Sequence, residues 1–143
     1  MLDLARDYLR RAEARLMAAE TSLSRGDYPE AVRYSQECVE MSLKASLRAM
    51  GIEYPKVHEV GRVLLIEGYR FPAWFREHIE QLAEISRDLA EKRAPSMYGV
   101  EAAGKPAGEL FNKEDAEEAV RNAKYVHEHA RRLVEEIMRK TEG

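Results

Sequence analysis

The sequence predicts an all-α protein, an up-and-down bundle of four long helices plus one short helix. Apolar residues recur at alternating intervals of three and four along most of the chain, and the eight glycines and five prolines gather in a few places between these stretches. No alternating apolar–polar run is long enough for a strand. Since 143 residues is an ordinary domain length, we expect one helical domain over residues 1–143.

The first two helices follow from apolar residues at helical spacing. Residues 2–24 carry one uninterrupted stripe (Leu2, Ala5, Leu9, Ala12, Leu16, Ala19, Leu23). Gly26 ends this helix, and a second helix runs to about Met50, where Gly51 offers a left-handed stop. Its inward stripe consists of small residues, which let a neighbouring helix approach closely (Ala31, Ser35, Cys38, Ser42, Ala45, Ala49).

The other helices are separated by turn residues. A short helix is expected from His58 to about Glu67, and a longer one from Ala73 to about Lys92, with Pro95 as its end. Residues 96–111 contain three glycines, one proline and no periodicity, so they predict a loop. Asn112 is placed to cap the last helix, whose inward face is regular (Ala116, Ala119, Ala123, Val126, Ala130, Leu133, Ile137).

The composition excludes several classes of protein. With 45% hydrophobic and 34% charged residues, the chain is too apolar for disorder and too charged for a membrane protein. No apolar run approaches the ~18 residues of a spanning helix. The single Cys38 excludes a disulfide framework, so a cytoplasmic location is expected. The net charge of -3 gives no global basic field, although a local basic patch remains compatible with it.

The sequence carries no recognisable metal or cofactor motif. A carboxylate-bridged di-iron bundle needs Glu-x-x-His on two helices, and none of the four histidines has a glutamate three residues before it. There is no phosphate-binding P-loop, no dinucleotide fingerprint and no Gly-x-Ser-x-Gly motif. We therefore expect neither a metal nor a cofactor.

Two segments carry candidate binding residues. Residues 69–76 (YRFPAWFR) combine four of the eleven aromatic residues with Arg70 and Arg76. Such a segment could stack bases and hold phosphates, or its aromatic side chains could seal the bundle while the arginines face water.

The second segment contains Arg93 and Tyr98. Arg93 extends the inward stripe of its helix, so its guanidinium group either pairs with a carboxylate or faces a cavity or a partner chain. A helix break at Pro95 would free Arg93 and Tyr98 to converge on one spot, where arginine could bind a phosphate in a bidentate manner and tyrosine could offer a hydroxyl group and a stacking face. Together with Lys105 and Arg70, these residues are the candidate nucleotide- or phosphate-binding set; the alternative is a capped helix end.

Several residues together resemble the HEPN domain family (higher eukaryote and prokaryote nucleotide-binding). They are Glu30-Ala31, the segment YSQECVE at 34–40, Leu43-Lys44-Ala45, and then Gly51, Pro55 and His58. The segment Arg93 to Gly99, the glycine- and proline-containing loop and the helix start Asp115-Ala116-Glu117 resemble the archaeal branch of the family. The resemblance covers nearly the whole chain and implies a helical bundle that forms homodimers.

The resemblance also implies a partner and an activity. Many HEPN proteins are encoded beside a minimal nucleotidyltransferase and form a toxin–antitoxin pair with it, and many are metal-independent ribonucleases that use an Arg, four to six residues and then a His. This chain has Arg93, four residues and then Tyr98. Since a phenol with a pKa near 10 is a poor base where an imidazole near 6.5 is a good one, the resemblance favours nucleotide or RNA binding over cleavage.

Two alternatives remain open. The chain could be a ribonuclease in which Arg93 binds the scissile phosphate and His58 or His127 replaces the missing base. Arg121 and His127 also satisfy the spacing of the motif, although they lie within the last helix with side chains about 120° apart. In the other alternative, the partner nucleotidyltransferase modifies Tyr98.

Overall fold

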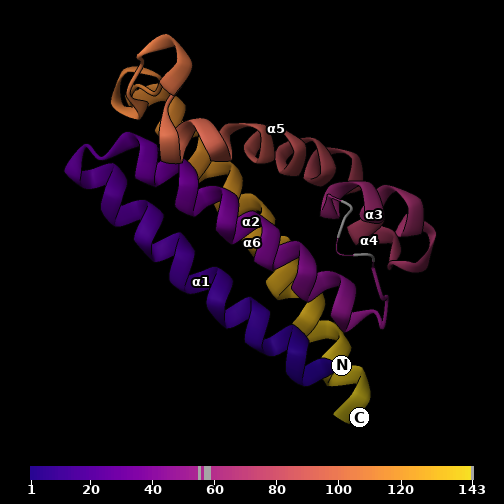
Figure 1. The fold of residues 1–143 in the computed structure, drawn as a ribbon. Coiled ribbons are helices and arrows are strands. Elements are labelled where there is room, and N and C mark those ends of the chain that lie inside the picture. Colours follow the sequence, from indigo (N-terminus) through magenta and orange to yellow (C-terminus); the bar gives the residue numbers. More distant parts are fainter. Residues whose placement is uncertain (55, 57–58, 143) are drawn as a thin grey trace.

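The computed structural model describes residues 1–54, 56 and 59–142, and its four long helices run alternately up and down (Figure 1). They are α1 (Leu2–Arg25), α2 (Tyr28–Ala49), α5 (Ile79–Tyr98) and α6 (Lys113–Glu142). The short helix α3 (Val60–Glu67) and the single turn α4 (Ala73–Arg76) connect α2 to α5. The predicted all-α bundle with four long helices and a short one is therefore confirmed.

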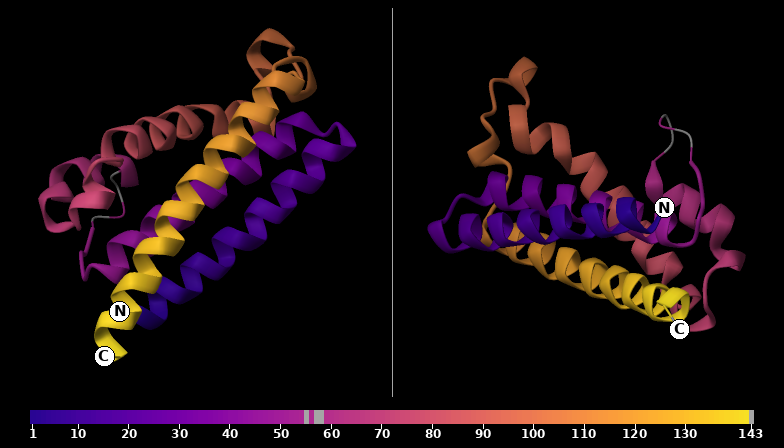
Figure 2. Two further views of the ribbon diagram at one scale, coloured as in Figure 1. Left: turned by 180° about the vertical axis from the view of Figure 1, so that it is seen from behind. Right: turned by 90° about the horizontal axis from the view of Figure 1, so that it is seen from below.

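Helix α2 is the centre of the bundle, because α1, α5 and α6 all pack against it. Its predicted stripe of small residues is buried along its whole length. Figure 2 shows α1, α2 and α6 running side by side, whereas α5 contacts α2 and has few contacts with α6. The arrangement leaves one face of α2, between α1 and α5, partly exposed to solvent, and we call it the open face.

The aromatic residues of segment 69–76 mostly belong to the core. Phe71 and Phe75 are buried, with their rings stacked at a centroid distance of 4.8 Å. Trp74 packs edge-on against Phe75, and its indole N–H donates a hydrogen bond to Glu136 (3.2 Å). Only Tyr69 of this group is largely exposed. The prediction that these rings seal the bundle is thus confirmed for Phe71 and Phe75.

The prediction that Pro95 ends its helix is wrong. Helix α5 continues through Pro95 to Tyr98, and the N–H of Gly99 closes the last turn on the carbonyl of Pro95 (2.9 Å). A proline removes one hydrogen bond from a helix, a loss that this final turn tolerates. The chain instead leaves the helix at Gly99, whose φ is +65° and where a Cβ atom would overlap the carbonyl oxygen of Lys105.

Two further boundaries differ from the prediction. The expected helix 73–92 is two helices, α4 and α5, which are separated at residues 77–78. The expected loop 96–111 begins at Gly99 and includes the 3-10 turns η2 (Glu101–Ala103) and η3 (Ala107–Glu109). An isolated antiparallel bridge between Val100 and Lys105 closes its first part.

The predicted cap of the last helix is present. The backbone N–H of Asn112 donates to the carboxylate of Asp115, and the N–H of Asp115 donates to the side-chain oxygen of Asn112, both at 2.9 Å. The reciprocal pair satisfies two backbone donors at the start of α6. None of the described helices combines the length and apolar character that crossing a membrane requires.

Candidate functional site: three arginines on Glu37

Three arginine side chains converge on the carboxylate of Glu37. The Nε atoms of Arg15 and Arg33 donate to Glu37 at 2.7 and 3.2 Å, and Nη1 of Arg93 donates to it at 2.8 Å. The same Nη1 also donates to the side-chain oxygen of Gln36 at 2.8 Å. We call Arg15, Arg33, Arg93 and Glu37 the arginine cluster.

The position of α2 in the bundle explains why these groups meet. Arg33 precedes Glu37 by one helical turn, so the two side chains lie on the same face of α2. Arg15 reaches this face from α1 and Arg93 reaches it from α5, the two helices that flank the open face. Gln36 is buried at the edge of this face and fixes the guanidinium group of Arg93 from a second side.

The electrostatics of the cluster favour an anion. Burial raises the pKa of the Glu37 carboxyl group, but the hydrogen bonds from Arg93, Arg15 and Arg33 outweigh this effect, so the pKa lies below its usual range. Glu37 is therefore ionised at neutral pH, and it neutralises one of three guanidinium charges. The side chain of Glu37 is only 12% exposed, whereas those of the three arginines are 37–39% exposed, so the arginine side chains are more accessible than the carboxylate that they bind.

The cluster satisfies one of the expectations for Arg93, namely that its guanidinium group pairs with a carboxylate. The convergence of Arg93 with Tyr98 was expected from a helix break that does not exist. Because α5 is continuous, two residues five positions apart point about 140° away from each other. Tyr98 is 61% exposed at the end of α5, and among the described residues no side-chain hydrogen bond of Arg93 reaches it.

The remaining candidates lie elsewhere. Lys105 is exposed in the loop after α5, where its backbone pairs with Val100. Arg70 lies in η1 (Gly68–Arg70), beside α3 and α4 and at the other end of α5 from Arg93 (Figure 1), and it pairs with Glu67 at 3.5 Å. Neither residue belongs to the arginine cluster.

The alternative ribonuclease residues do not form a second pair. Arg121 is exposed on α6, whereas His127 is 8% exposed. Burial lowers the pKa of His127, and within the described chain its Nε2 atom has no hydrogen-bond partner. His127 is buried and neutral, whereas Arg121 is exposed and six positions away on the same helix. The two side chains therefore do not form one catalytic site. His58 lies outside the described residues.

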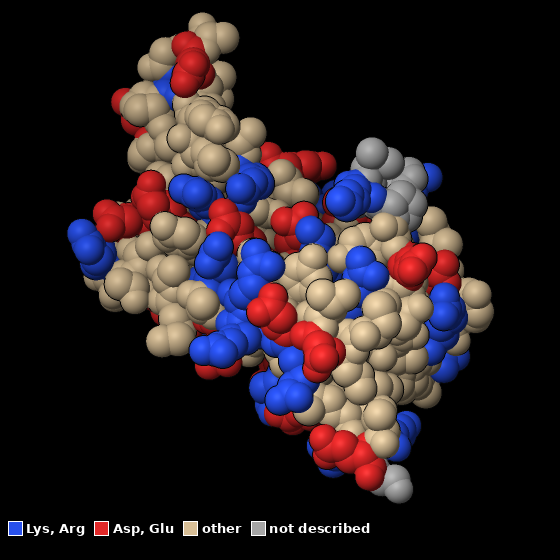
Figure 3. All heavy atoms as spheres, turned by 60° about the horizontal axis from the view of Figure 1, so that its bottom comes forward, with Lys and Arg blue, Asp and Glu red and all other residues tan. Residues whose placement is uncertain are grey.

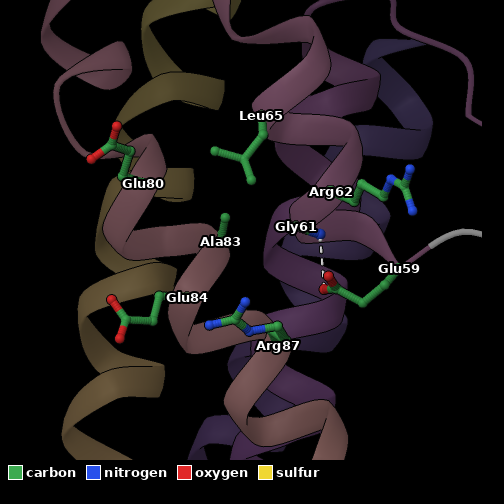
Figure 4. A pocket seen from close by; sticks show the side chains of 8 residues that line it. All are labelled: Glu59, Gly61, Arg62, Leu65, Glu80, Ala83, Glu84 and Arg87. Atoms are coloured by element: carbon green, nitrogen blue, oxygen red, sulfur yellow. Dashed lines mark hydrogen bonds between the residues drawn. The ribbon is translucent and has the colours of Figure 1, made fainter.

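A separate hollow of about 550 Å³ lies between α3 and α5 (Figure 4). Gly61 and Ala83 form its floor, and the sticks show acidic and basic side chains around its rim. A Cβ atom on Gly61 would lie 3.0 Å from the carbonyl oxygen of Ala83, so the glycine permits the close approach of α3 to α5. Its mixed charges single out no class of ligand. Among the described residues, no group of three or more His, Cys, Asp or Glu could hold a metal ion.

Comparison with known proteins agrees with this fold. The sequence profile of the HEPN domain matches residues 5–133. The chain belongs to the HEPN domain family. A relative of this HEPN chain, "Putative toxin MJ1304" of Methanocaldococcus jannaschii, is 33% identical over an alignment of 136 positions, and the alignment covers 87% of this chain and 84% of the relative.

Two solved structures show the same HEPN fold. The protein TT1696 from Thermus thermophilus has a TM-score of 0.71 at 26% identity, with 90% of this chain and 97% of that chain covered. The archaeal HEPN homologue ST0689 has a TM-score of 0.64 at 24% identity and covers 91% of this chain and 97% of its own.

Sequence reasoning found Arg93 in this HEPN chain but missed its neighbours. Arg15 is one of five arginines on α1, so its type alone does not single it out, and Arg33 lies on α2 outside the stripe of small residues. One local signal was available, because Arg33 and Glu37 are four apart on one helix face. The pairing of Arg93 with Glu37 spans 56 positions, so only the packing of α5 on α2 brings them together.

Proposed function

We propose that this chain is a toxin-like HEPN protein whose arginine cluster binds a phosphate group of RNA or of a nucleotide. The observation that carries the proposal is the gathering of three guanidinium groups on one carboxylate, which leaves two uncompensated positive charges at a half-exposed place. Support for the toxin-like role comes from the relative whose name is "Putative toxin MJ1304".

The chemistry of arginine suits a phosphate. A guanidinium group presents its N–H donors in a planar fork that matches two phosphate oxygens, and three such groups from three helices can surround one phosphate. Glu37 and Gln36 hold Arg93 in place before a ligand arrives. Such preorganisation reduces the side-chain entropy that binding must overcome.

We propose that the chain binds RNA or a nucleotide, and that Arg93 and Tyr98 alone do not cleave RNA. A phenol in place of the imidazole forfeits roughly 10²- to 10⁴-fold of general-base catalysis, and among the described residues no histidine is hydrogen-bonded to the arginine cluster. The ribonuclease alternative would need His58 or His127 to act as the base.

The test compares binding and cleavage of a labelled single-stranded RNA in EDTA. Arg93→Gln should weaken binding about tenfold, which corresponds to the loss of one charge-assisted contact to phosphate. The control, Lys113→Gln, removes an exposed positive charge at the start of α6 and should leave binding unchanged. Equal affinity of the wild type and Arg93→Gln would overturn the proposal, and cleavage that His127→Ala abolishes would establish the ribonuclease instead.

The partners that we propose are a second copy of the chain and a minimal nucleotidyltransferase. The family resemblance is the main support, and we add the exposed apolar side chains beside the end of α5, Tyr98 and Val100. Sedimentation velocity of the purified protein should show a dimer, and a monomer at micromolar concentration would contradict this part of the proposal.

One observation favours nucleotidylation of Tyr98 as a second candidate function. The side chain is 61% exposed at the end of a rigid helix, so a partner enzyme could reach its hydroxyl group. In this reaction the phenol oxygen attacks the α-phosphate of ATP, a new P–O bond forms, pyrophosphate leaves and the phenolic proton is released. Intact mass after incubation with the partner enzyme and ATP should rise by one adenylate, and Tyr98→Phe should remove the increase. An unchanged mass of the wild type would reject this candidate.

A further inference from the structure

The open face of α2 carries a second group of cations beyond the arginine cluster. Residues of α2 that are not buried between positions 33 and 48 include five charged side chains at spacings of four, three, four and four (Arg33, Glu37, Glu40, Lys44, Arg48). This spacing places all five along one stripe of the helix. Figure 3 shows Lys and Arg side chains gathered across the middle of the visible face, with fewer Asp and Glu among them.

A pocket of about 270 Å³ lies at the far end of this stripe. It is lined by side chains of α1, α2, the segment after α2 and the start of α3 (Tyr8, Glu40, Lys44, Arg48, Tyr54, Lys56, Val60). Its lining contains three cations and one carboxylate. The Nζ of Lys44 is 3.8 Å from Glu40, a long ion pair that leaves the ammonium group available.

Arg48 is the unusual residue of this pocket. Its guanidinium group lies 4.9 Å from the centroid of the Tyr54 ring, and its Nε atom is buried with no hydrogen-bond partner in the described part of the chain. A buried donor without a partner is energetically costly, so such a group is typical of a place where a water molecule or a ligand completes the bonding. Lys44 also lies 5.9 Å from the centroid of the Tyr8 ring.

The pocket therefore combines cations with two aromatic rings. Lys44, Arg48 and Lys56 offer donors to phosphate oxygens, while Tyr8 and Tyr54 offer flat apolar surface to a base. A volume of about 270 Å³ is below the ~300 Å³ at which pockets for drug-sized ligands begin, so the pocket matches one phosphate with one base or sugar.

The distance between the two sites indicates how they could be used together. Glu37 and Arg48 are eleven residues apart on α2, which is about 16 Å along the helix axis. At ~3.4 Å per nucleotide of a stacked strand, about five nucleotides span this separation, and a more extended strand needs fewer. Six cations and two carboxylates lie along the path (Arg15, Arg33, Arg93, Lys44, Arg48, Lys56, Glu37, Glu40).

We propose that the open face of α2 is a track for single-stranded nucleic acid, with one phosphate on the arginine cluster and a second nucleotide in the pocket of Tyr8, Lys44, Arg48 and Tyr54. This inference rests on the proposed function, because it assumes that the cluster binds a phosphate of the same strand. It adds the second subsite, the path between the two and the class of ligand, a strand rather than a single nucleotide.

The experiment measures how affinity depends on ligand length. A labelled octanucleotide RNA spans both subsites, whereas a dinucleotide and AMP each reach only one of them. The octanucleotide should bind more tightly than the dinucleotide. Lys44→Gln should weaken octanucleotide binding about three- to tenfold and reduce the slope of log affinity against log salt by about 0.7, so that most of the advantage over the dinucleotide is lost. Arg93→Gln should weaken both strands. Lys113→Gln serves as the charge-matched control, and circular dichroism verifies that each variant is folded.

The outcomes separate the inference from the proposed function. If Arg93→Gln weakens the octanucleotide but Lys44→Gln does not, the track is overturned while the phosphate site stands. If the octanucleotide binds no more tightly than the dinucleotide, the two sites bind their ligands independently and the track is again overturned. If Arg93→Gln changes no affinity, the proposed function fails, and the track fails with it.

Discussion

Replacement of Glu37 by glutamine tests the physical account of the arginine cluster. The change is nearly isosteric but removes the charge that holds three guanidinium groups together. Each of the three hydrogen bonds contributes about 0.5–1 kcal/mol, because the arginines are more than one-third exposed and water screens the interaction. Since glutamine retains one acceptor oxygen, we expect a loss of about 1–2 kcal/mol in the free energy of unfolding, or about 3–8 °C in Tm.

The same change should strengthen anion binding. Gln36 and the remaining oxygen of residue 37 can still accept hydrogen bonds from Arg93, so the preorganisation is largely kept. With residue 37 neutral, the net charge of the cluster rises by one, and removal of one negative charge about 4–5 Å from a phosphate is worth about 1 kcal/mol in a water-like dielectric. Phosphate or oligonucleotide affinity should therefore increase about fivefold while stability falls. Calorimetry and titration of one protein preparation measure both quantities.

The pH dependence of this effect has a definite sign. The pKa of Glu37 is lower in the folded protein than its ordinary value of 4.5, so its stabilising effect is fully present above about pH 4.5 and disappears as the pH falls through the folded pKa. The difference between wild type and Glu37→Gln should be constant from about pH 5 to 8 and shrink in acid.

A matched control separates the cluster from ordinary surface charge. Glu135→Gln removes a carboxylate that pairs with a single arginine and is 49% exposed, and it should change stability by less than about 0.5 kcal/mol. If Glu37→Gln is no more destabilising than Glu135→Gln, or if it weakens anion binding, the account of the cluster is refuted.

Two further predictions concern stability. Gly99→Ala places a Cβ atom against the carbonyl oxygen of Lys105 and 2.8 Å from the backbone nitrogen of Ala107, at a φ of +65°. It should therefore lower the free energy of unfolding, measured by denaturant titration, by at least about 2 kcal/mol. The control Gly108→Ala has open space around it and should cost less than about 1 kcal/mol; equal effects of the two variants would contradict the argument. Burial lowers the pKa of His127 in the folded protein below 6.5, so the free energy of unfolding should fall as the pH drops below about 6.5. His127→Leu should make the free energy of unfolding less dependent on pH in this range. An unchanged pH profile in the variant would assign the pH dependence to another group.

The sequence predicts the fold better than the helix ends. The three–four spacing of apolar residues reports directly which side of each helix is buried. The small residues of α2 are buried where other helices pack against it, as their size predicts. The end of α5 was misjudged because a proline near a helix terminus removes only one hydrogen bond, and the structure absorbs that loss. The constraint that ends α5 is the contact between Gly99 and Lys105, which no local pattern reveals.

The sequence predicts one residue of the candidate site, Arg93, but not the residues that surround it. Arg93 stood out because it continues an apolar stripe with a charge, but its partners come from two other helices. The geometry also changes the chemical interpretation. Tyr98 lies on another side of the helix and Glu37 is already hydrogen-bonded to Arg93. On the proposed function, a phosphate would therefore meet three guanidinium groups rather than one arginine and one phenol.

The arrangement of charge on α2 explains how an acidic protein would bind an anion as we propose. The net charge of -3 belongs to the whole surface, but a ligand feels mainly the charges within about one Debye length, roughly 8–10 Å at physiological salt. On the open face of α2, Glu37 and Glu40 are outnumbered by the cations around them, so the local potential has the opposite sign to the net charge. On this proposal, the local excess of arginine and lysine makes nucleic-acid binding strong at low salt and weak at high salt. A neutral ligand of the same shape should bind weakly, and salt should not change its affinity.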